Sequence, residues 1–579
     1  MKIIKLVIKN YRSFDQTGQT IIFPTIHSAL VGKNNSGKSN IFNALNIVLG
    51  SKLPGYIKFE EEDYFDKTHP IEIEVELGDI LEGDKDTLFS IPGLTKPQRG
   101  ALGSKITNHT ATINFLLKKS LDGSLVEELT EDTKEGFEIK LWGFLVHRKT
   151  EDIRKMIVKM LLVPAIRNYQ EDLSASKWTL YGQLMKEILE NSSQYDDIKV
   201  ALSDLNSKIQ GVFDSERKKI LKDAKIVSCV DDINFQLTKD NNPSELLRNL
   251  EVFITEGSKI FNIDHVGTGT QSAIIIGILE LVLKNKNAKA KLFCIEEPET
   301  FIHPQGIRYL GSLIKDVSKE QNTQVIISTH SLSLVANFEP IEIIRVDKIG
   351  GKTIIRQDAS LTNSHYRRFI HQDNAEMFFS DRILFVEGST EKHLFSNLDK
   401  QTILDTSTQD SINCNFDRIN LGVIKLDSVD SIVNYVKIAK AFNIEFVALL
   451  DKDFITDPSK SNIRKKLCEE LCVEFQDSDQ TKLISDFKLK NIIINSVGEI
   501  EDLFSDQDIA SITGKNIAEI QTIKTTFHKT SKAFGILFST GKAEYAIVIA
   551  DYYIENNLRH PLDDFIRKIY KNDIVNINI

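Results

Sequence analysis

The stretch Ile383-Leu-Phe-Val-Glu387-Gly388-Ser-Thr-Glu391 decides how the chain is interpreted. Its four apolar residues predict a buried strand, with Glu387 at the carboxyl end of that strand. Gly388 permits a tight turn, after which the sequence predicts a helix. Glu391 lies one helical turn beyond Glu387, so both carboxylates are expected to face one point outside the carboxyl edge of a sheet. Open α/β sheets place their ligands at that edge.

A second acidic pair follows further along the chain. The run Phe446-Val-Ala-Leu-Leu450 predicts another buried strand and ends in Asp451-Lys452-Asp453. Residues two apart on a strand point the same way, so Asp451 and Asp453 are expected to share a face. Four carboxylates at two strand ends suit hard divalent cations, which prefer oxygen ligands. The alternative is that both strands end in acids that are merely solvated.

A phosphate-binding loop lies near the start of the chain. The predicted strand Ile26 to Val31 leads into Gly32-Lys-Asn-Asn-Ser-Gly37-Lys38-Ser39, a complete G-x-x-x-x-G-K-S pattern, and a predicted helix follows. The glycines let backbone N–H groups surround phosphates at a helix N-terminus. Lys38 is expected to reach the β- and γ-phosphates, and Ser39 to ligate Mg²⁺. The expected nucleotide contacts are Gly32, Asn35, Gly37, Lys38, Ser39 and Asn40.

The phosphate-binding loop is a hallmark of P-loop ATPases, and three later motifs are typical of the second half of such an ATPase domain. Leu292 to Glu297 predicts a buried strand that ends in acids: Glu296 would hold Mg²⁺ through water, and Glu297 would polarise the attacking water. Val325 to His330 predicts a strand ending in a histidine that would sense the γ-phosphate. The third motif resembles the signature with which ABC-type ATPases close over a partner subunit's nucleotide. Its expected contacts are Gly269, Gln271 and Ser272.

Length and composition describe an ordinary globular chain. The 579 residues suggest about three or four domains, and a net charge of −10 does not suggest polyanion binding over the whole surface. No apolar run approaches the ~20 residues that span a bilayer. The start does not resemble a signal peptide. Five scattered cysteines favour a reducing cytosol over a disulfide framework. We therefore expect a cytoplasmic protein with no membrane partner.

The ordered motifs resemble the OLD (overcoming lysogenization defect) family of ATP-dependent nucleases. The glutamate pair and the later Asp-x-Asp resemble the Toprim domain that this family shares with topoisomerases and primases. The opening strands resemble RecF-like and SMC-like ATPase heads, and the run Glu296 to Glu299 matches the "EEPE" form of OLD and RecF-like proteins. The architecture is also similar to the nuclease subunits of Gabija anti-phage systems. The resemblance implies an α/β fold: an ABC/RecF-like P-loop ATPase with a helical insert, then a Rossmann-like Toprim nuclease domain.

The resemblance implies further site residues. OLD nucleases carry a third acidic group after a strand such as Asn491 to Gly498. Glu501 matches it best, while Glu499 stays open because the register is uncertain by two residues. Lys542, just before a predicted helix, resembles the late lysine of the family's catalytic site; a surface lysine at a helix start is the alternative. The implied nuclease metal ligands are Glu387, Glu391, Asp451, Asp453, Glu499 and Glu501.

Domain boundaries follow from the positions of the motifs. A short heptad seam from Ile198 to Val212 favours a dimerisation helix over packing on its own domain. The expected segments are an ATPase N-terminal half (1–165), a helical dimerisation insert (166–255), an ATPase C-terminal half (256–348), a connector (349–380) and a Toprim nuclease domain with C-terminal helices (381–579).

The sequence therefore predicts an ATP-regulated, metal-dependent DNA endonuclease acting in anti-phage defence. It would use ATP and Mg²⁺ or Mn²⁺ and assemble as a homodimer or homotetramer, and its relatives imply a UvrD-like helicase partner. The alternative is a RecF/SMC-like DNA repair ATPase or clamp whose Toprim domain does not cleave. A topoisomerase or primase is disfavoured, because the sequence shows neither a tyrosine in an obvious winged-helix setting nor a zinc ribbon. The sign of the nucleotide effect stays open.

Overall fold

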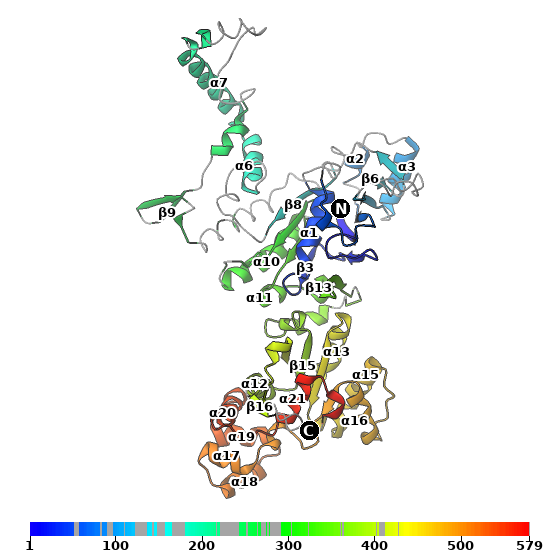
Figure 1. Cartoon of the computed structure of the whole chain (residues 1–579), viewed down its shortest axis with the longest axis vertical. Coiled ribbons are helices and arrows are strands. Elements are labelled where there is room, and N and C mark those ends of the chain that lie inside the picture. Colours follow the sequence, from blue (N-terminus) through cyan, green and yellow to red (C-terminus); the bar gives the residue numbers. More distant parts are fainter. Residues whose placement is uncertain are drawn as a thin grey trace. The chain divides into compact units, whose positions relative to one another are not determined.

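The computed structural model divides into two compact units, each described by itself below (Figure 1). The first holds Met1–Gly18 and Ser39–Thr329, and the second holds Gln19–Lys38 and His330–Ile579. The structure describes residues 1–50, 57–80, 84–89, 96–108, 111–121, 136–141, 144–147, 157–164, 180–215, 217–219, 242–249, 253–256, 258–262, 265–267, 274, 277, 291–300, 302, 304–321, 323–358, 360–361, 364–400, 402–404, 411–426 and 428–577.

An antiparallel sheet occupies the N-terminal part of the first unit. Its strands alternate, as half-exposed strands should: Ile73 and Val75 are buried, whereas Glu72 between neighbouring apolar residues accepts a hydrogen bond from Lys9 at 3.0 Å. The apolar face of each strand therefore supplies core, and the charged face is paired. The strands, in sheet order, are β1 (Lys2–Lys9), β4 (Ile71–Gly78), β5 (Ile113–Lys119), β6 (Gly136–Leu141) and β7 (Phe144–His147).

Parallel strands carry the nucleotide motifs in both units. In the first unit β11 (Lys291–Glu296) lies between β8 (Lys159–Val163) and β12 (Thr323–Ser328). In the second unit the fully buried β3 (His27–Val31) pairs with β13 (Ile343–Ile349). The strands predicted before each motif are thus confirmed. Two further strands belong to this part of the second unit: β14 (Lys352–Arg356), antiparallel to β13, and β2 (Gln19–Ile22).

The first unit also contains the predicted insert helix. α7 (Tyr195–Val212) covers the heptad seam, with Leu202 buried but Leu205 45% and Val212 73% exposed. Much of the insert lies outside the described residues. The other elements are α1 (Lys38–Leu49), η2 (Glu61–Asp63), α2 (Lys85–Phe89), α3 (Lys96–Thr107), α6 (Leu180–Glu190), η7 (Pro243–Asn249), β9 (Phe253–Glu256), β10 (Lys259–Asn262) and α10 (Pro304–Gln321). Lys38, the first residue of α1, is the last residue of the segment Gln19–Lys38 of the second unit.

A four-stranded parallel sheet organises the second unit. Its order is β18 (Leu421–Lys425), β15 (Arg382–Val386), β19 (Glu445–Leu450) and β20 (Ile492–Ile494). The predicted strands of the two acidic pairs are therefore confirmed and adjacent. β15 and β19 lie in the middle of the sheet and are apolar almost throughout, as strands covered on both faces must be. All carboxyl ends point to one edge.

Helices cover this sheet and extend beyond it (Figure 1). α12 (Ser389–Leu398) and α20 (Lys542–Glu555) pack together and share one apolar core with β15 and β19. Within the ranges given above, no single helix has the length and apolar character to cross a membrane, and only the pair α19–α20, bent by 75°, would pass on length and composition. The remaining elements are α11 (Leu332–Val335), η9 (Pro340–Glu342), η10 (Ser364–Phe369), η11 (Ala375–Phe378), β16 (Thr402–Leu404), β17 (Ser411–Asn413), η12 (Phe416–Ile419), η13 (Val429–Ser431), α13 (Ile432–Ala441), α14 (Asp453–Thr456), η14 (Pro458–Lys460), α15 (Ser461–Leu471), α16 (Gln480–Leu489), η15 (Ile500–Leu503), α17 (Asp506–Thr513), α18 (Ile517–Thr526), α19 (Thr530–Phe538), α21 (Asp563–Lys571) and η16 (Ile574–Asn576).

Candidate active site

Acidic residues follow the carboxyl ends of three adjacent strands of the four-stranded sheet. Glu387 follows β15, Asp451 follows β19, and Glu501 comes shortly after β20. Because these strands are parallel neighbours, their acids gather at one edge. The Asp451 N–H donates to a Glu387 carboxylate oxygen at 3.3 Å. We call this group of residues, with Glu391, Asp453 and Glu499, the acid edge.

The turn after β15 makes room for a second glutamate. Gly388 is the N-cap of α12, and Glu391 lies in the first turn of that helix. A Cβ at position 388 would stand 2.8 Å from a Glu391 carboxylate oxygen, so a larger residue would push this carboxylate aside. Glu391 is only 6% exposed. Burial, and then the charge of Glu501, raise its pKa to about 7.

The pKa of the Asp451 carboxyl group is strongly raised. Burial raises its pKa to about 9, with further contributions from the charges of Glu387, Glu391, Glu501 and Glu499. Burial also raises the pKa of Glu387, and Asp453 adds to this, while Lys460 and Lys529 act in the opposite direction. Clustered carboxylates that cannot all ionise comfortably form a site that attracts cations.

Two hydroxyl groups hold Glu501. Its carboxylate accepts hydrogen bonds from Tyr545 Oη at 2.5 Å and from Thr390 Oγ1 at 2.8 Å. Tyr545 comes from α20 and Thr390 from α12, two helices that pack together. Glu501 is 2% exposed, and its burial raises its pKa although both hydrogen bonds lower it. A buried carboxylate with fixed partners is preorganised to serve as a ligand.

Glu499 takes a different position from Glu501. Its carboxylate accepts hydrogen bonds from the Ser531 N–H at 2.8 Å and the Ser531 hydroxyl at 3.2 Å, in the first turn of α19. Lys529 Nζ lies 3.6 Å from the same carboxylate. The sequence left the choice between these two acids open. In the structure Glu501 contacts the core of the site through Thr390, whereas Glu499 is held at the start of α19.

The expectation that Asp451 and Asp453 share a strand face is wrong, because neither residue belongs to the strand. β19 ends at Leu450, and Asp453 is already the first residue of α14, so the period of two does not reach it. The Asp453 carboxylate instead accepts a hydrogen bond from Lys460 Nζ at 2.9 Å, and Lys529 Nζ lies 3.8 Å away. Asp453 nevertheless stays at the acid edge, because its charge acts on Glu387.

Lysines partly balance the acid edge. Lys542, at the start of α20, is exposed, and its charge acts on Glu391 and Glu501. The pKa of Lys529 is raised: its partial burial lowers the pKa, but the attraction of Glu499, Asp453, Glu387 and Asp451 outweighs this. Sequence reasoning did not place Lys529, Lys460, Thr390 or Tyr545 at the site. Only Tyr545 had a signal, because it lies three residues after Lys542, one turn along the same predicted helix.

The donor chemistry of the acid edge fits divalent metal ions. Six carboxylates, several of them buried, offer the hard oxygen ligands that Mg²⁺ and Mn²⁺ prefer. Among the described residues, however, no group of three or more His, Cys, Asp or Glu side chains is already arranged to hold a metal ion. Metal binding would therefore require side-chain movement or oxygen ligands from water or a phosphate.

The phosphate loop between β3 and α1 has the geometry that its motif requires. Gly32 and Gly37 have φ angles of +143° and +113°, and Asn35 has +61°. A Cβ at Gly32 would stand 2.1 Å from the Val346 carbonyl oxygen, so no side chain fits there. Lys38 Nζ donates to the carbonyl oxygens of Gly32 at 2.9 Å and Lys33 at 2.8 Å. These bonds hold the ammonium group across the loop.

The first unit holds the acids predicted to activate water. Glu296 ends β11, and Glu297 has a φ of +41°, a conformation unusual for a residue with a side chain. The Glu297 N–H donates to the Ser328 carbonyl oxygen at 2.9 Å, which ties this strained residue to the end of β12. Strain at such a position is typical of functional sites.

The remaining predicted nucleotide contacts are only partly described. The Asn40 side chain donates to Ser13 Oγ at 2.9 Å and accepts from Arg12 at 3.3 Å. Ser39 is the second residue of α1. The His330 ring lies beside the Phe379 ring, with centroids 6.2 Å apart. The expected contacts of the signature motif, Gly269, Gln271 and Ser272, lie outside the described residues.

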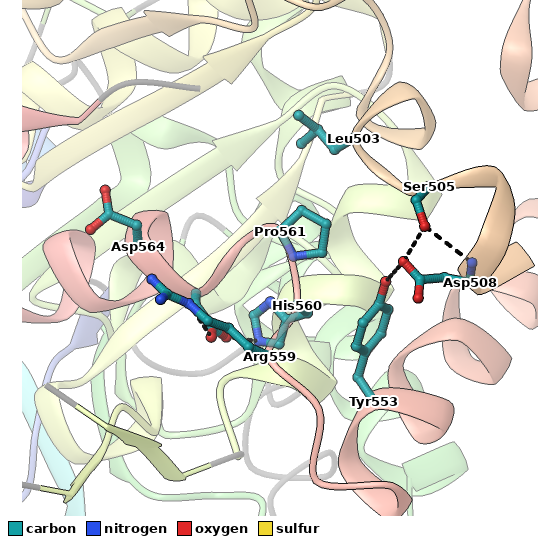
Figure 2. Close-up of a pocket in the computed structure, with 9 residues that line it drawn as sticks. Leu503, Ser505, Asp508, Tyr553, Arg559, His560, Pro561 and Asp564 are labelled. Carbon is teal, nitrogen blue, oxygen red and sulfur yellow. Dashed lines mark hydrogen bonds and ion pairs between the residues drawn. The ribbon is translucent and has the colours of Figure 1, made fainter. Parts of the chain in front are cut away.

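A separate cavity of about 350 Å³ lies near the C-terminus (Figure 2). Tyr553 Oη donates to Asp508 at 2.9 Å in its wall. None of the six carboxylates of the acid edge lines it. We therefore place the candidate active site at the acid edge. The residues lining the cavity are Leu503, Ser505, Asp508, Tyr553, Arg559, His560, Pro561, Asp563 and Asp564.

Comparison with protein families gives two matches. Residues 1–335 match the family described as "AAA ATPase domain". Residues 378–453 match the family described as "Overcoming lysogenization defect protein-like, TOPRIM domain". The second match contains Glu387, Glu391, Asp451 and Asp453, and ends before Glu499 and Glu501.

Three curated relatives are nucleases by name. The Old nuclease of Escherichia phage P2 is 25% identical over 496 residues, covering 79% of this chain and 78% of the relative. The OLD nuclease of Thermus scotoductus is 25% identical over 474 residues, covering 78% of this chain and 81% of the relative. The Endonuclease GajA of Bacillus cereus is 25% identical over 278 residues, covering 40% of this chain and 38% of the relative.

Proposed function

This chain belongs to the AAA ATPase domain family and carries an OLD-like TOPRIM domain, and on that premise we propose that it is a DNA endonuclease that depends on divalent metal ions and is regulated by ATP. The observation that carries the proposal is the acid edge. Three adjacent strand ends bring Glu387, Asp451 and Glu501 together. Burial raises the pKa of each, and the charges of neighbouring acids raise it further at Glu387 and Asp451.

The metal ions, when bound, would activate water and stabilise the leaving oxygen of a phosphodiester. In this proposal Glu387, Glu391 and Asp451 supply the inner oxygen ligands. Glu501 completes them, and its hydrogen bonds to Thr390 and Tyr545 fix its orientation. Asp453 and Glu499 stand at the outer side, beside Lys529. Lys542 would steady the negative charge that develops on the phosphate.

At the nucleotide loop, Lys38 and the backbone N–H groups of the loop would bind the phosphates of ATP. The geometry needed for this is present in the loop itself: positive φ at Gly32 and Gly37, and an ammonium group held across the loop. Ser39 would ligate the accompanying Mg²⁺. Glu296 would assist through water, and Glu297 would polarise the attacking water.

Two contacts within the second unit support control of the nuclease by nucleotide. Lys33, in the phosphate loop, forms an ion pair with Asp381 at 2.5 Å. His330, the expected γ-phosphate sensor, lies beside Phe379. Phe379 and Asp381 lie within three residues of the start of β15, the strand that Glu387 follows. A change at the loop or at His330 would therefore reach the acid edge through one short strand. Both side chains of the ion pair are half-exposed, so the ion pair contributes little stability and can break readily.

A plasmid cleavage assay with Mg²⁺, Mn²⁺ or Ca²⁺, with and without ATP, tests the proposal. Glu387→Ala should lower the cleavage rate by about 10²–10³-fold, because groups that act at the reacting centre contribute on that scale. Glu445→Ala, at the opposite end of β19 and exposed, is the matched control and should cleave normally. Metal-dependent cleavage retained by Glu387→Ala would contradict the assignment.

The same assay examines the ATP part of the proposal. Lys38→Ala should abolish the response of cleavage to ATP while metal-dependent cleavage persists. Cleavage that ignores both ATP and Lys38 would rule out the coupling. ATP hydrolysis without any cleavage would favour a repair ATPase or clamp instead.

We further propose DNA as substrate, a homodimer or homotetramer as the working form, a cytoplasmic location and a role in anti-phage defence beside a UvrD-like helicase. The exposed Leu205 and Val212 on α7 support self-association, because a helix with solvent-facing apolar positions gains by pairing. Leu205→Glu with Val212→Glu should lower the mass measured by light scattering if α7 forms the contact.

A further inference from the structure

Lys529 bridges two acids that reach the acid edge from different strands. Its Nζ lies 3.8 Å from Asp453, which follows β19, and 3.6 Å from Glu499, which follows β20. Lys529 directly precedes α19, and its side chain is 56% exposed. One flexible ammonium group thus stands between the acid edge and solvent.

Lys460 provides an internal comparison. Its Nζ makes a hydrogen bond of 2.9 Å to Asp453, and its side chain is only 14% exposed. Lys529 is longer than hydrogen-bond distance from both of its acids and is far more exposed. Charge attraction, rather than a directed hydrogen bond, therefore holds Lys529 in place, and its long side chain can move without breaking a fixed contact.

Glu499 does not depend on Lys529 for its position. The N–H and hydroxyl groups of Ser531 hold its carboxylate independently. Asp453 is likewise still held by Lys460. Removing the Lys529 ammonium therefore removes one positive charge from the edge while leaving both acids where they are.

We propose that Lys529 is a resident counter-cation of the acid edge, which divalent metal ions displace and which then binds a DNA phosphate beside the cut. This inference rests on the proposed nuclease function and adds a residue to it. Before metal binds, the ammonium group offsets repulsion between acids. Once metal ions neutralise the acids, the attraction that held Lys529 weakens, and a phosphate becomes its better partner.

The first consequence concerns metal affinity without DNA. A positive charge close to the site competes with an incoming cation. Lys529→Ala should therefore bind Mn²⁺ about three- to tenfold more tightly than the wild type, the range expected for one unit charge in a partly hydrated site. A lysine with a merely structural role would leave Mn²⁺ affinity unchanged or weaken it.

The second consequence concerns DNA. With Ca²⁺ in place of the cleaving ion, Lys529→Ala should bind duplex DNA more weakly, and the slope of log K against log salt should fall by about one unit, because one phosphate contact is lost. The same charge thus opposes one ligand and favours the next.

Calorimetry with Mn²⁺ and DNA-binding titrations with Ca²⁺ on the full chain test both consequences. Lys532→Ala is the matched control: it removes an exposed lysine of α19, three residues after Lys529, and should change neither quantity. Lys529→Arg keeps the charge and should keep the wild-type Mn²⁺ affinity. Thermal denaturation in EDTA checks that every variant is folded.

Unchanged or weaker Mn²⁺ binding by Lys529→Ala, or an unchanged salt slope, overturns the inference. If the wild type binds Mn²⁺ and cleaves DNA normally in that case, the nuclease proposal stands and only the role of Lys529 fails. If the wild type itself neither binds Mn²⁺ nor cleaves, both fail together.

Discussion

The phosphate loop and the acid edge are both suited to phosphate chemistry, but they are built from opposite materials. The loop is eight consecutive residues, and its properties come from backbone angles at Gly32 and Gly37. The acid edge comes from side chains spread over more than a hundred residues of sequence, gathered by the order of parallel strands. Its properties come from burial and charge.

This difference implies different weaknesses. A site made of backbone depends on conformation, so one added methyl group can destroy it. A site made of crowded acids depends on charge balance. Without metal, repulsion between the buried acids lowers the unfolding free energy of the protein, and removal of one acidic charge should raise it again. Each of the following predictions would break or sharpen this contrast.

The largest effect is expected for Gly32→Ala. The new Cβ would meet the Val346 carbonyl oxygen at 2.1 Å, at a φ that disfavours side chains, so the unfolding free energy of this unit should fall by about 2–5 kcal/mol and ATP binding should be lost. Urea denaturation and ATP titration measure both. Gly211→Ala, in α7 with nothing near its Cβ, should be close to neutral. A stable, ATP-binding Gly32→Ala protein would refute the backbone account.

An intermediate effect of opposite sign is expected for Asp451→Asn. The folded state holds protons on Asp451 (pKa about 9) and Glu391 (pKa about 7) where the unfolded chain has lost them above about pH 4. The folded state therefore binds more protons, and the unfolding free energy of the metal-free protein should fall as pH rises from about 4 to about 9. Asp451→Asn should flatten this fall and stabilise the protein by about 1–3 kcal/mol at pH 8.5.

Denaturation in EDTA at pH 5.5 and pH 8.5 measures this second prediction. Asp430→Asn, an exposed aspartate elsewhere in the same unit, should leave the pH dependence as it is. Saturating Mn²⁺ should restore stability in the wild type but much less in Asp451→Asn. If Asp451→Asn destabilises the metal-free protein at pH 8.5, repulsion does not govern the acid edge.

The smallest effect is expected for Tyr545→Phe, which removes a hydrogen bond to Glu501 but no charge. The unfolding free energy should fall by about 1 kcal/mol, and the Mn²⁺ concentration for half-maximal cleavage should rise about tenfold, as for other residues that orient a metal ligand. Tyr553→Phe, on the same helix, removes the bond to Asp508 and should give the stability loss alone. Equal metal effects in both variants would mean that Glu501 has no special role.

The contrast also explains what the sequence could predict. The sequence predicts the complete phosphate loop, because its residues are contiguous and the positions that require an unusual backbone conformation are glycines. The strands of the acid edge were found from their apolar runs, and β15, β19 and β20 confirm them. Local patterns suffice for elements whose physics is local.

The arrangement at the acid edge was less accessible. Strand periodicity was extended to Asp453, but the chain turns into α14 at that residue. The positions of Glu499 and Glu501 depend on contacts with α19 and α20, which no local pattern records. The same holds for Lys529, whose partners Asp453 and Glu499 come from other elements. Electrostatic partners at long sequence separation require the fold before they can be assigned.

The order of the strands has a consequence for protein synthesis. The edge strand β20 and α20, whose Tyr545 holds Glu501, are the last parts of the acid edge to leave the ribosome. The phosphate loop emerges about 350 residues before Glu387. At ~5–20 residues per second this interval is about 20–70 s. A nascent chain would thus complete its phosphate loop well before its acid edge.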